Sequence, residues 1–188
     1  MTSTARELIP VAADRFSHAV HGVPDDRWDA ETPCADWSVR DLVNHLVSEH
    51  LWAPPLLAGQ TIEQVGDRFD GDLLGDDPAA AWDRAMAASL PAFADASDDQ
   101  EVHLSFGTVP VEGYASQMLV DLTVHCWDLA RGAGLPEKLD PGTVEKSLEY
   151  ARSHTDQYAA SGLFAPAVEV AGEDPQDLLL GLLGRDPG

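Results

Sequence analysis

The segment LVDLTVHCWDLARG, residues 119–132, determines how the rest of the chain is interpreted. Its apolar residues recur three and four positions apart, which is the spacing of side chains on one face of an α-helix. Asp121, His125 and Asp128 share a second stripe, which borders the apolar one. A carboxylate buried without a partner costs several kcal/mol, so this stripe predicts a cluster of paired polar groups or a shared cation in a helical core.

A second segment, VRDLVNHLVSEHLWA at residues 39–53, shows the same arrangement. Ser38 is a suitable N-cap because Asp41 follows three residues later, as in a capping box. Steps of three and four residues place His45 and Glu49 in a row of otherwise apolar side chains. His50 belongs to a neighbouring apolar row, so it competes with His45 for the inward face of this predicted helix.

Two such helices facing each other would bring His45, Asp121 and His125 together. Together these residues would supply the three nitrogen and oxygen ligands of a catalytic-type zinc site, which keeps its fourth position open. The alternative is structural: Asp121 and His125, four residues apart, form a simple hydrogen-bonded pair worth about 0.2–0.5 kcal/mol. Spacing alone leaves both interpretations open.

The other predicted elements follow from capping, turn and alternation signals. Pro54 and Pro55 are expected to end or bend the second helix, leaving Leu56 and Leu57 in a turn or a bent extension. The remaining elements are a helix from Thr4 to about His21, a helix from Pro78, an extended or hairpin segment at 101–112, the helix from about Gly113 to Arg131, a helix from Pro141 to about Tyr158, and a short helix from Pro175 closed by Gly184. The expected fold is therefore all-α, a four-helix bundle with short additional C-terminal helices, in a single domain spanning residues 1–188.

The charge of the chain limits its partners. Its 188 residues include 33 acidic and 11 basic side chains, for a formal net charge of −22. A surface this negative repels nucleic-acid phosphates and anionic membrane surfaces, so neither is expected as a partner. No apolar run approaches the ~18 residues of a membrane span and no signal peptide is evident, so a cytoplasmic location is predicted.

Neither the cysteines nor the remaining histidines are predicted to take part in a site. Cys34 and Cys126 are the only cysteines, too few and too far apart for a disulfide framework or a thiolate zinc cage. Cys126 lies about 100° around the helix from His125, which indicates an inert core thiol. Trp37 and Trp127 are interpreted as core anchors. The histidines expected to be solvated, without an acidic partner, are His18, His21, His103 and His154.

Three blocks of sequence carry a family resemblance: TPCADWSVRDLVNHLV at 32–47, DLTVHCWDLARGAG at 121–134 and FAPAVEVAGEDPQDLLLGLLGRDP at 164–187. Together they resemble the actinobacterial metal-binding proteins of the DinB-like superfamily that are related to the N-terminal domain of mycothiol-dependent maleylpyruvate isomerase. The resemblance covers nearly the whole chain. It implies a DinB-like four-helix bundle of up-down-down-up topology, with a divalent metal at one end of the core.

The resemblance also implies a ligand set and a cofactor. The ligands would be His45, Asp121 and His125, and the ion Zn²⁺, with Ni²⁺ as the alternative. Asp121 stands where the isomerase has glutamate, so either the helix approaches more closely or a water bridges to the ion. The metal would activate mycothiol or another low-molecular-weight thiol, which makes the chain a thiol-dependent transferase or isomerase acting on a small electrophilic substrate.

Several points stay open at the level of sequence. Glu49 or Asp128 could orient a ligand histidine, and Arg131 could meet a substrate carboxylate or simply be solvated at a helix end. The rival functions are a non-catalytic or stress-related metal-binding protein, a bundle that has lost its metal, and a metal-dependent hydrolase of a small amide or ester with Glu49 as base. No mycothiol pocket can be mapped, the C-terminal segment is too short for the isomerase's second domain, and a homodimer is left open.

Overall fold

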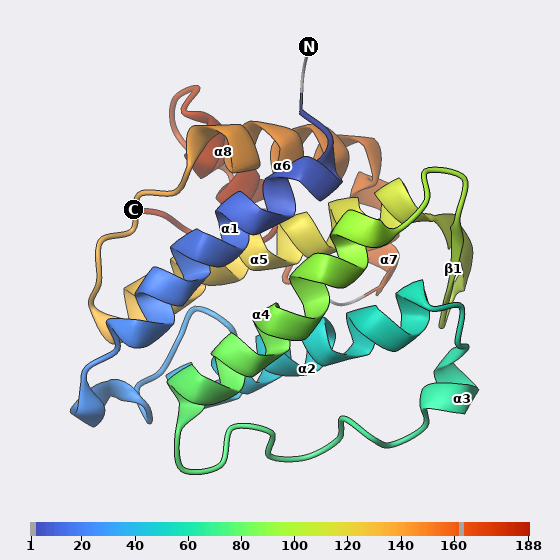
Figure 1. Ribbon diagram of the computed structural model, residues 1–188. Helices are drawn as coiled ribbons and strands as arrows, with labels where there is room; N and C mark the ends of the chain where they lie inside the picture. Colours follow the sequence, from blue (N-terminus) through green and yellow to red (C-terminus); the bar gives the residue numbers. More distant parts are fainter. Residues whose placement is uncertain (1–2, 162–163) are drawn as a thin grey trace.

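Four long helices form the body of the protein. The computed structural model describes residues 3–161 and 164–188 (Figure 1). The long helices are α1 (Ala5–His21), α2 (Val39–Leu57), α4 (Pro78–Asp95) and α5 (Val111–Ala133). α1 and α5 run in one direction and α2 and α4 in the opposite direction, because a long connection crosses the bundle between α2 and α4 (Figure 1). The all-α, up-down-down-up bundle is therefore confirmed.

Local capping fixes where the predicted helices begin. The Thr4 and Ser38 side chains each accept a hydrogen bond from the backbone N–H three residues on. The carboxylates of Glu7 and Asp41 in turn accept one from the backbone N–H of Thr4 and Ser38, so both helices start with a capping box. Asp77 caps α4, with Pro78 in the first helical position. These signals use only neighbouring residues, which is why the sequence locates the helix starts.

Two boundaries differ from the prediction. α2 continues through Pro54 and Pro55 to Leu57 instead of ending near Ala53. Leu56 and Leu57 are buried, and their packing compensates for the amide donors that the prolines lack. The helix expected from Pro141 to Tyr158 is interrupted at His154, and it forms α6 (Pro141–Ser153) and α7 (Thr155–Ser161).

The remaining elements include a hairpin and several short helices. β1 (Glu101–Leu104) and β2 (Gly107–Pro110) form the expected antiparallel hairpin, pairing Glu101 with Pro110. α8 (Pro175–Leu182) is the predicted last helix, and Gly184 follows it with a φ of 82°. Two further short elements are a 3₁₀ turn at Asp25–Arg27 and α3 (Ile62–Val65). In the described part of the chain, no helix is long and apolar enough to span a membrane.

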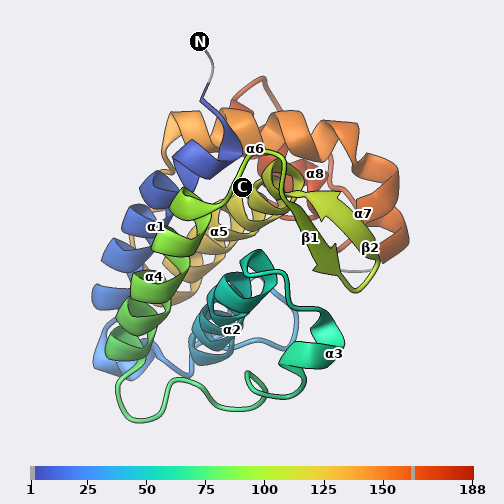
Figure 2. The ribbon, with the colours of Figure 1, turned by 45° about the vertical axis from the view of Figure 1, so that its right-hand side comes forward.

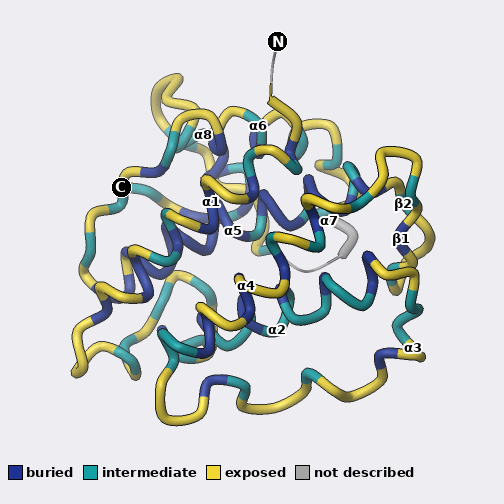
Figure 3. The backbone as a smooth tube through the Cα atoms, viewed as in Figure 1, coloured by how far each residue is buried: buried dark blue, intermediate teal, exposed yellow. Residues whose placement is uncertain are grey.

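The core consists of two helix pairs that meet where α1 contacts α4 and where α2 contacts α5. α1 packs mainly on α5, and α2 mainly on α4 (Figure 2). Buried residues line the inward faces of all four helices (Figure 3), and Phe16 of α1 meets Trp82 of α4 with ring centroids 4.6 Å apart. We call the interface between α2 and α5, which run antiparallel, the seam. The candidate site lies in this seam.

A glycine on α5 brings a loop up to this seam. A Cβ atom on Gly132 would lie 3.0 Å from the carbonyl oxygen of Glu31 and 3.0 Å from Cγ2 of Thr32, so a larger residue would push the loop away. The residues that follow Thr32 in this loop include Cys34 and Trp37, which both contact the candidate site.

Candidate metal centre

His45 from α2 and Asp121 and His125 from α5 converge on the seam. Asp121 lies between the two imidazoles: its Oδ2 is 3.2 Å from Nε2 of His45, and its Oδ1 is 3.2 Å from Nε2 of His125. One ligand atom from each residue lies within 4.8 Å of the other two. The three residues predicted from the two helical stripes are thus brought together.

The donor atoms fit a divalent ion. Bonds of about 2.0–2.2 Å in a tetrahedron place neighbouring ligand atoms about 3.3–3.6 Å apart. The two 3.2 Å contacts involve different oxygens of Asp121, but one donor atom from each residue lies within 4.8 Å of the other two, so small side-chain adjustments would bring all three onto one ion. The His125 side chain is 6% exposed, whereas Asp121 and His45 are 22% and 26% exposed, so solvent reaches the outer side of the cluster. Asp121 touches both histidines directly, so α2 and α5 approach each other closely at this point.

The charges of the three residues depend on one another. Burial would raise the pKa of Asp121, but His125 and His45 outweigh it and hold that pKa far below its usual range. Burial would lower the pKa of His125, but Asp121, with help from Asp128, raises it well above its ordinary value. Asp121 is therefore ionised and His125 is protonated without an ion, so a cation that binds there would take the place of the Nε2 proton of His125.

A buried ion pair holds His125 from behind. Nδ1 of His125 lies 3.0 Å from Oδ2 of Asp128, and because a carboxylate only accepts hydrogen bonds, the imidazole donates. Asp128 is fully buried and receives two hydrogen bonds from Arg185, at 2.8 and 3.2 Å. The His125 and Arg185 bonds overcome burial and keep the pKa of Asp128 low. Nε2 of His125 is thereby directed at the seam.

Cys34 lies against the buried Asp128–Arg185 ion pair, a contact that the sequence did not predict. Its Sγ lies 3.2 Å from Oδ2 of Asp128, 3.2 Å from Arg185 and 3.6 Å from Nδ1 of His125. Cys34, His125 and Asp128 could by distance hold a second ion. The Arg185 guanidinium already supplies the positive charge there, so we interpret this group as the support for His125.

Glu49 lies near the three candidate ligands, whereas Arg131 makes its contacts elsewhere. Glu49 lies one turn beyond His45 on α2, and burial, followed by the charge of Asp121, raises its pKa. Arg131 instead pairs with Glu137 at 2.7 Å and covers the Trp127 ring at 4.5 Å. The structure therefore keeps Glu49 beside the triad and assigns Arg131 to the end of α5.

The two tryptophans divide between the core and the site. Trp127 is buried, as predicted for a core anchor. Trp37 is only half-buried, and its ring lies 4.8 Å from that of His45 and 5.8 Å from that of His125. Trp37 thus covers both histidines, a role that its position before a helix start did not reveal.

The remaining histidines correct one prediction. His18 and His21 are exposed, as expected, but each has an acidic partner: Asp14 at 3.5 Å and Asp83 at 3.0 Å. The His18 pair has the usual i,i+4 helix spacing, whereas Asp83 comes from α4 and could only be found in three dimensions. Neither pair is near the seam.

His50 lies on the far side of α2 from the centre. It is fully buried, and its Nδ1 is 2.8 Å from the hydroxyl of Ser89 on α4. Its proximity to α4 resolves the competition with His45, which faces α5. Burial lowers the pKa of His50 to about 3.

The buried imidazole of His50 predicts a pH dependence of stability. Because its pKa is about 3 in the fold and 6.5 as the ordinary value, it gains a proton on unfolding below about pH 6.5. The contribution of neutral His50 to the free energy of unfolding is fully present above that pH. It is lost as the pH falls, by about 1.4 kcal/mol per pH unit. In urea unfolding from pH 7 to pH 5, His50→Gln should remove this slope, and exposed His103→Gln should retain it; equal slopes in both variants would contradict the assignment.

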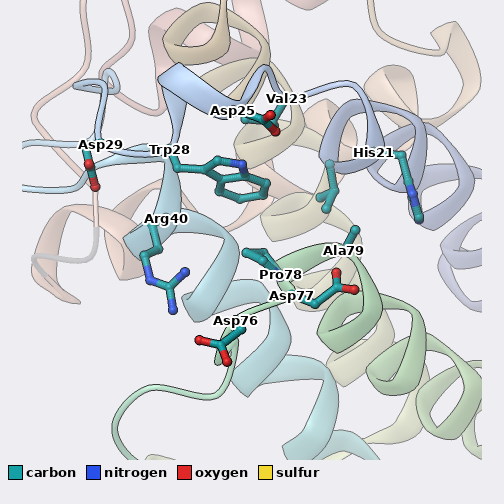
Figure 4. Close-up of a pocket in the computed structure, with 11 residues that line it drawn as sticks. His21, Val23, Asp25, Trp28, Asp29, Arg40, Asp76, Asp77, Pro78 and Ala79 are labelled. Carbon is teal, nitrogen blue, oxygen red and sulfur yellow. The ribbon is translucent and has the colours of Figure 1, made fainter.

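A separate hollow of about 490 Å³ lies between the end of α1 and the starts of α2 and α4 (Figure 4). Trp28 lines it together with Asp25, Asp29, Asp76 and Asp77. This acidic lining repels anionic ligands, and none of His45, Asp121 and His125 belongs to it. The hollow is therefore not part of the candidate metal centre.

Comparison with known proteins assigns the family. The model of the mycothiol maleylpyruvate isomerase N-terminal domain matches residues 10–130, well over half of the chain. The chain belongs to this family. Two uncharacterized proteins of Mycobacterium tuberculosis, MT0763 and Rv0738, are each 29% identical to it over 185 residues, covering 93% of both sequences.

Solved structures show the same fold. The crystal structure of a mycothiol-dependent maleylpyruvate isomerase superposes with a TM-score of 0.60, and a single-site mutant of that enzyme with 0.64. Each comparison has 16% sequence identity and covers 84% of this chain and 71% of the other. The family and the helical fold predicted from the sequence are confirmed, and the relatives are actinobacterial as expected. Zinc and the wider DinB-like grouping stay predictions.

Proposed function

We propose that this protein is a thiol-dependent isomerase or transferase for a small electrophilic substrate, with a divalent ion, preferably Zn²⁺, held by His45, Asp121 and His125. The observation that carries the proposal is the convergence of these three donors, two of them 3.2 Å from the third, with His125 fixed from behind by Asp128. Membership of a family named for a mycothiol-dependent isomerase supports mycothiol, or a related small thiol, as the co-substrate.

The ion would supply acidity toward the thiol. A bound divalent cation acts as a Lewis acid that brings the pKa of a coordinated thiol toward neutrality. With an ion bound, His125 would be neutral and would offer Nε2 as the ligand atom, because its Nδ1–H donates a hydrogen bond to Asp128. Arg185 keeps Asp128 ionised, so the imidazole retains this tautomer and orientation.

The surrounding side chains handle protons and water. A carboxyl with a raised pKa is suited to accept and return a proton, and Glu49 is such a carboxyl one turn from His45. Trp37 covers one side of both histidines and excludes water there. The half-open side at Asp121 and His45 is where substrate would enter.

The reaction itself conserves its atoms. The thiolate sulfur adds to one carbon of an alkene conjugated to a carbonyl, and the electron pair moves to the carbonyl oxygen as an enolate. The former double bond can then rotate, and loss of the thiolate restores the alkene in the other geometry. If the enolate carbon takes a proton instead, the product is a thiol conjugate, which is the transferase outcome.

Turnover with and without thiol tests the proposal. Zinc-loaded protein, purified without an affinity tag, should isomerise maleylpyruvate or conjugate a model electrophile only when mycothiol is present. His125→Ala should lower this rate by a hundredfold or more, because the ion loses a ligand, whereas the exposed His103→Ala should match the wild type. Turnover of a small ester without thiol would favour the hydrolase instead, and metal binding without any turnover would favour a non-catalytic metal protein.

A further inference from the structure

Tyr114 carries a buried hydroxyl that the preceding mechanism does not use. It lies on α5 seven residues before Asp121, on the same stripe as Gln117 and the ligand residues. The residue is 4% exposed, and its hydroxyl oxygen has no hydrogen-bond partner among the residues that the structure describes. Its ring packs on Phe93, with centroids 5.5 Å apart.

Tyr114 lies about two helical turns from Asp121 along α5, on the stripe that carries Asp121 and His125. α2 and α5 are antiparallel (Figure 2). A residue one turn beyond His45 on α2, such as Glu49, is therefore expected opposite the part of α5 that precedes Asp121. After burial itself, Glu49 and Asp121 are the groups that raise the pKa of Tyr114. The phenol is therefore protonated and lies within the electrostatic influence of two residues of the site.

The hydrogen-bonding capacity of this phenol is unused by the described protein groups. A buried polar group without a partner costs free energy, whereas phenylalanine would fill the same volume without that cost. A tyrosine with this cost, located beside a ligand site, is the arrangement expected when the bound ligand supplies the missing acceptor.

We propose that Tyr114 donates a hydrogen bond to the carbonyl oxygen of the electrophilic substrate, where negative charge collects as the thiolate adds. This inference rests on the proposed function and assigns it a catalytic residue. A donor at that oxygen stabilises the enolate more than the uncharged carbonyl and so acts on the rate. Glu49 and Asp121 would repel a free carboxylate at this position, which favours a carbonyl oxygen as the acceptor.

The variant Tyr114→Phe tests the proposal in zinc-loaded protein. We expect kcat/KM for maleylpyruvate to fall about tenfold or more, mostly in kcat, since a bond to a developing charge is lost. The melting temperature should stay equal or rise, because the unpaired hydroxyl is gone, and the cobalt spectrum of the thiol complex should be unchanged. Tyr150→Phe is the control, since Tyr150 is a half-buried phenol that already has Gln117 as its partner.

The outcomes separate this inference from the proposed function. If the wild type turns over and Tyr114→Phe keeps kcat/KM within twofold of the wild-type value, the role of Tyr114 is overturned and the proposed function stands. A lower melting temperature with unchanged kinetics would have the same meaning, because it is the result expected if an internal water paired the hydroxyl. If the wild type shows no turnover, pyruvate serves as a carbonyl probe. A pyruvate-induced rise in melting temperature that Tyr114→Phe abolishes would support the donor without the reaction, and no rise in the wild type would contradict it.

Discussion

Replacing both His45 and His125 with alanine is expected to abolish stoichiometric metal binding. The two imidazoles supply two of the three donors that converge on the seam, and Asp121 alone cannot hold an ion against water. Removal of groups that merely orient a ligand typically weakens metal affinity by about 10–100-fold. Loss of each ligand histidine should therefore weaken zinc affinity by more than about 100-fold. Elemental analysis after purification without a tag measures the effect, since column nickel could otherwise fill the site.

The matched control is the double variant His18→Ala/His103→Ala, which removes two exposed imidazoles away from the seam. It should retain as much zinc as the wild type, and circular dichroism should show that both double variants keep their helices. Stoichiometric zinc in the protein that lacks His45 and His125 would remove the proposed centre. Family and fold would stand, because they rest on comparisons that do not involve the metal.

Replacing Arg185 with methionine is expected to lower the free energy of unfolding by about 3 kcal/mol or more. The change leaves the fully buried Asp128 carboxylate without its cation, and breaking a buried pair from one side costs about 3–5 kcal/mol. Zinc affinity should fall as well, by about 10–100-fold, because Asp128 no longer holds His125 in one orientation. Urea unfolding and zinc titration provide the two measurements.

A second substitution separates the lost charge pair from lost packing. Adding Asp128→Asn to Arg185→Met removes the uncompensated charge, so the double variant should be more stable than Arg185→Met alone. If the two substitutions destabilise additively, the pair is not coupled and the cost of Arg185→Met is one of packing. Arg131 lies on the same helix as Asp128 and forms an ion pair that is open to solvent. Arg131→Met should change the free energy of unfolding by less than about 1 kcal/mol.

Much of the fold and the triad could be predicted because the responsible signals are local. Thr4, Ser38 and Asp77 each cap a helix through a neighbour only three residues away. The i,i+4 spacing of Asp121 and His125 places them on one side of α5 in any packing of the bundle. Only the approach of His45 required the tertiary fold. The polar row on the second helix indicated it, and the family resemblance pointed to the same residues.

The support around the triad could not be predicted because it depends on contacts between distant segments. Arg185 reaches Asp128 from 57 residues away, and Cys34 reaches it across 94. Both residues were within the blocks that carried the family resemblance, yet no spacing rule relates them to a helix face. The extension of α2 through Pro54 and Pro55 likewise depends on the burial of Leu56 and Leu57, which local propensity does not contain.

The position of the centre on the seam has a consequence beyond chemistry. One ligand belongs to the α2–α4 pair and the other two to the α1–α5 pair, so an ion bound by all three fastens the halves of the bundle to each other. An ion that binds only the folded chain raises its stability in proportion to the logarithm of the ion's concentration. Metal supply would then govern the lifetime of the molecule as well as its reactivity, and starvation for the ion would shorten both together.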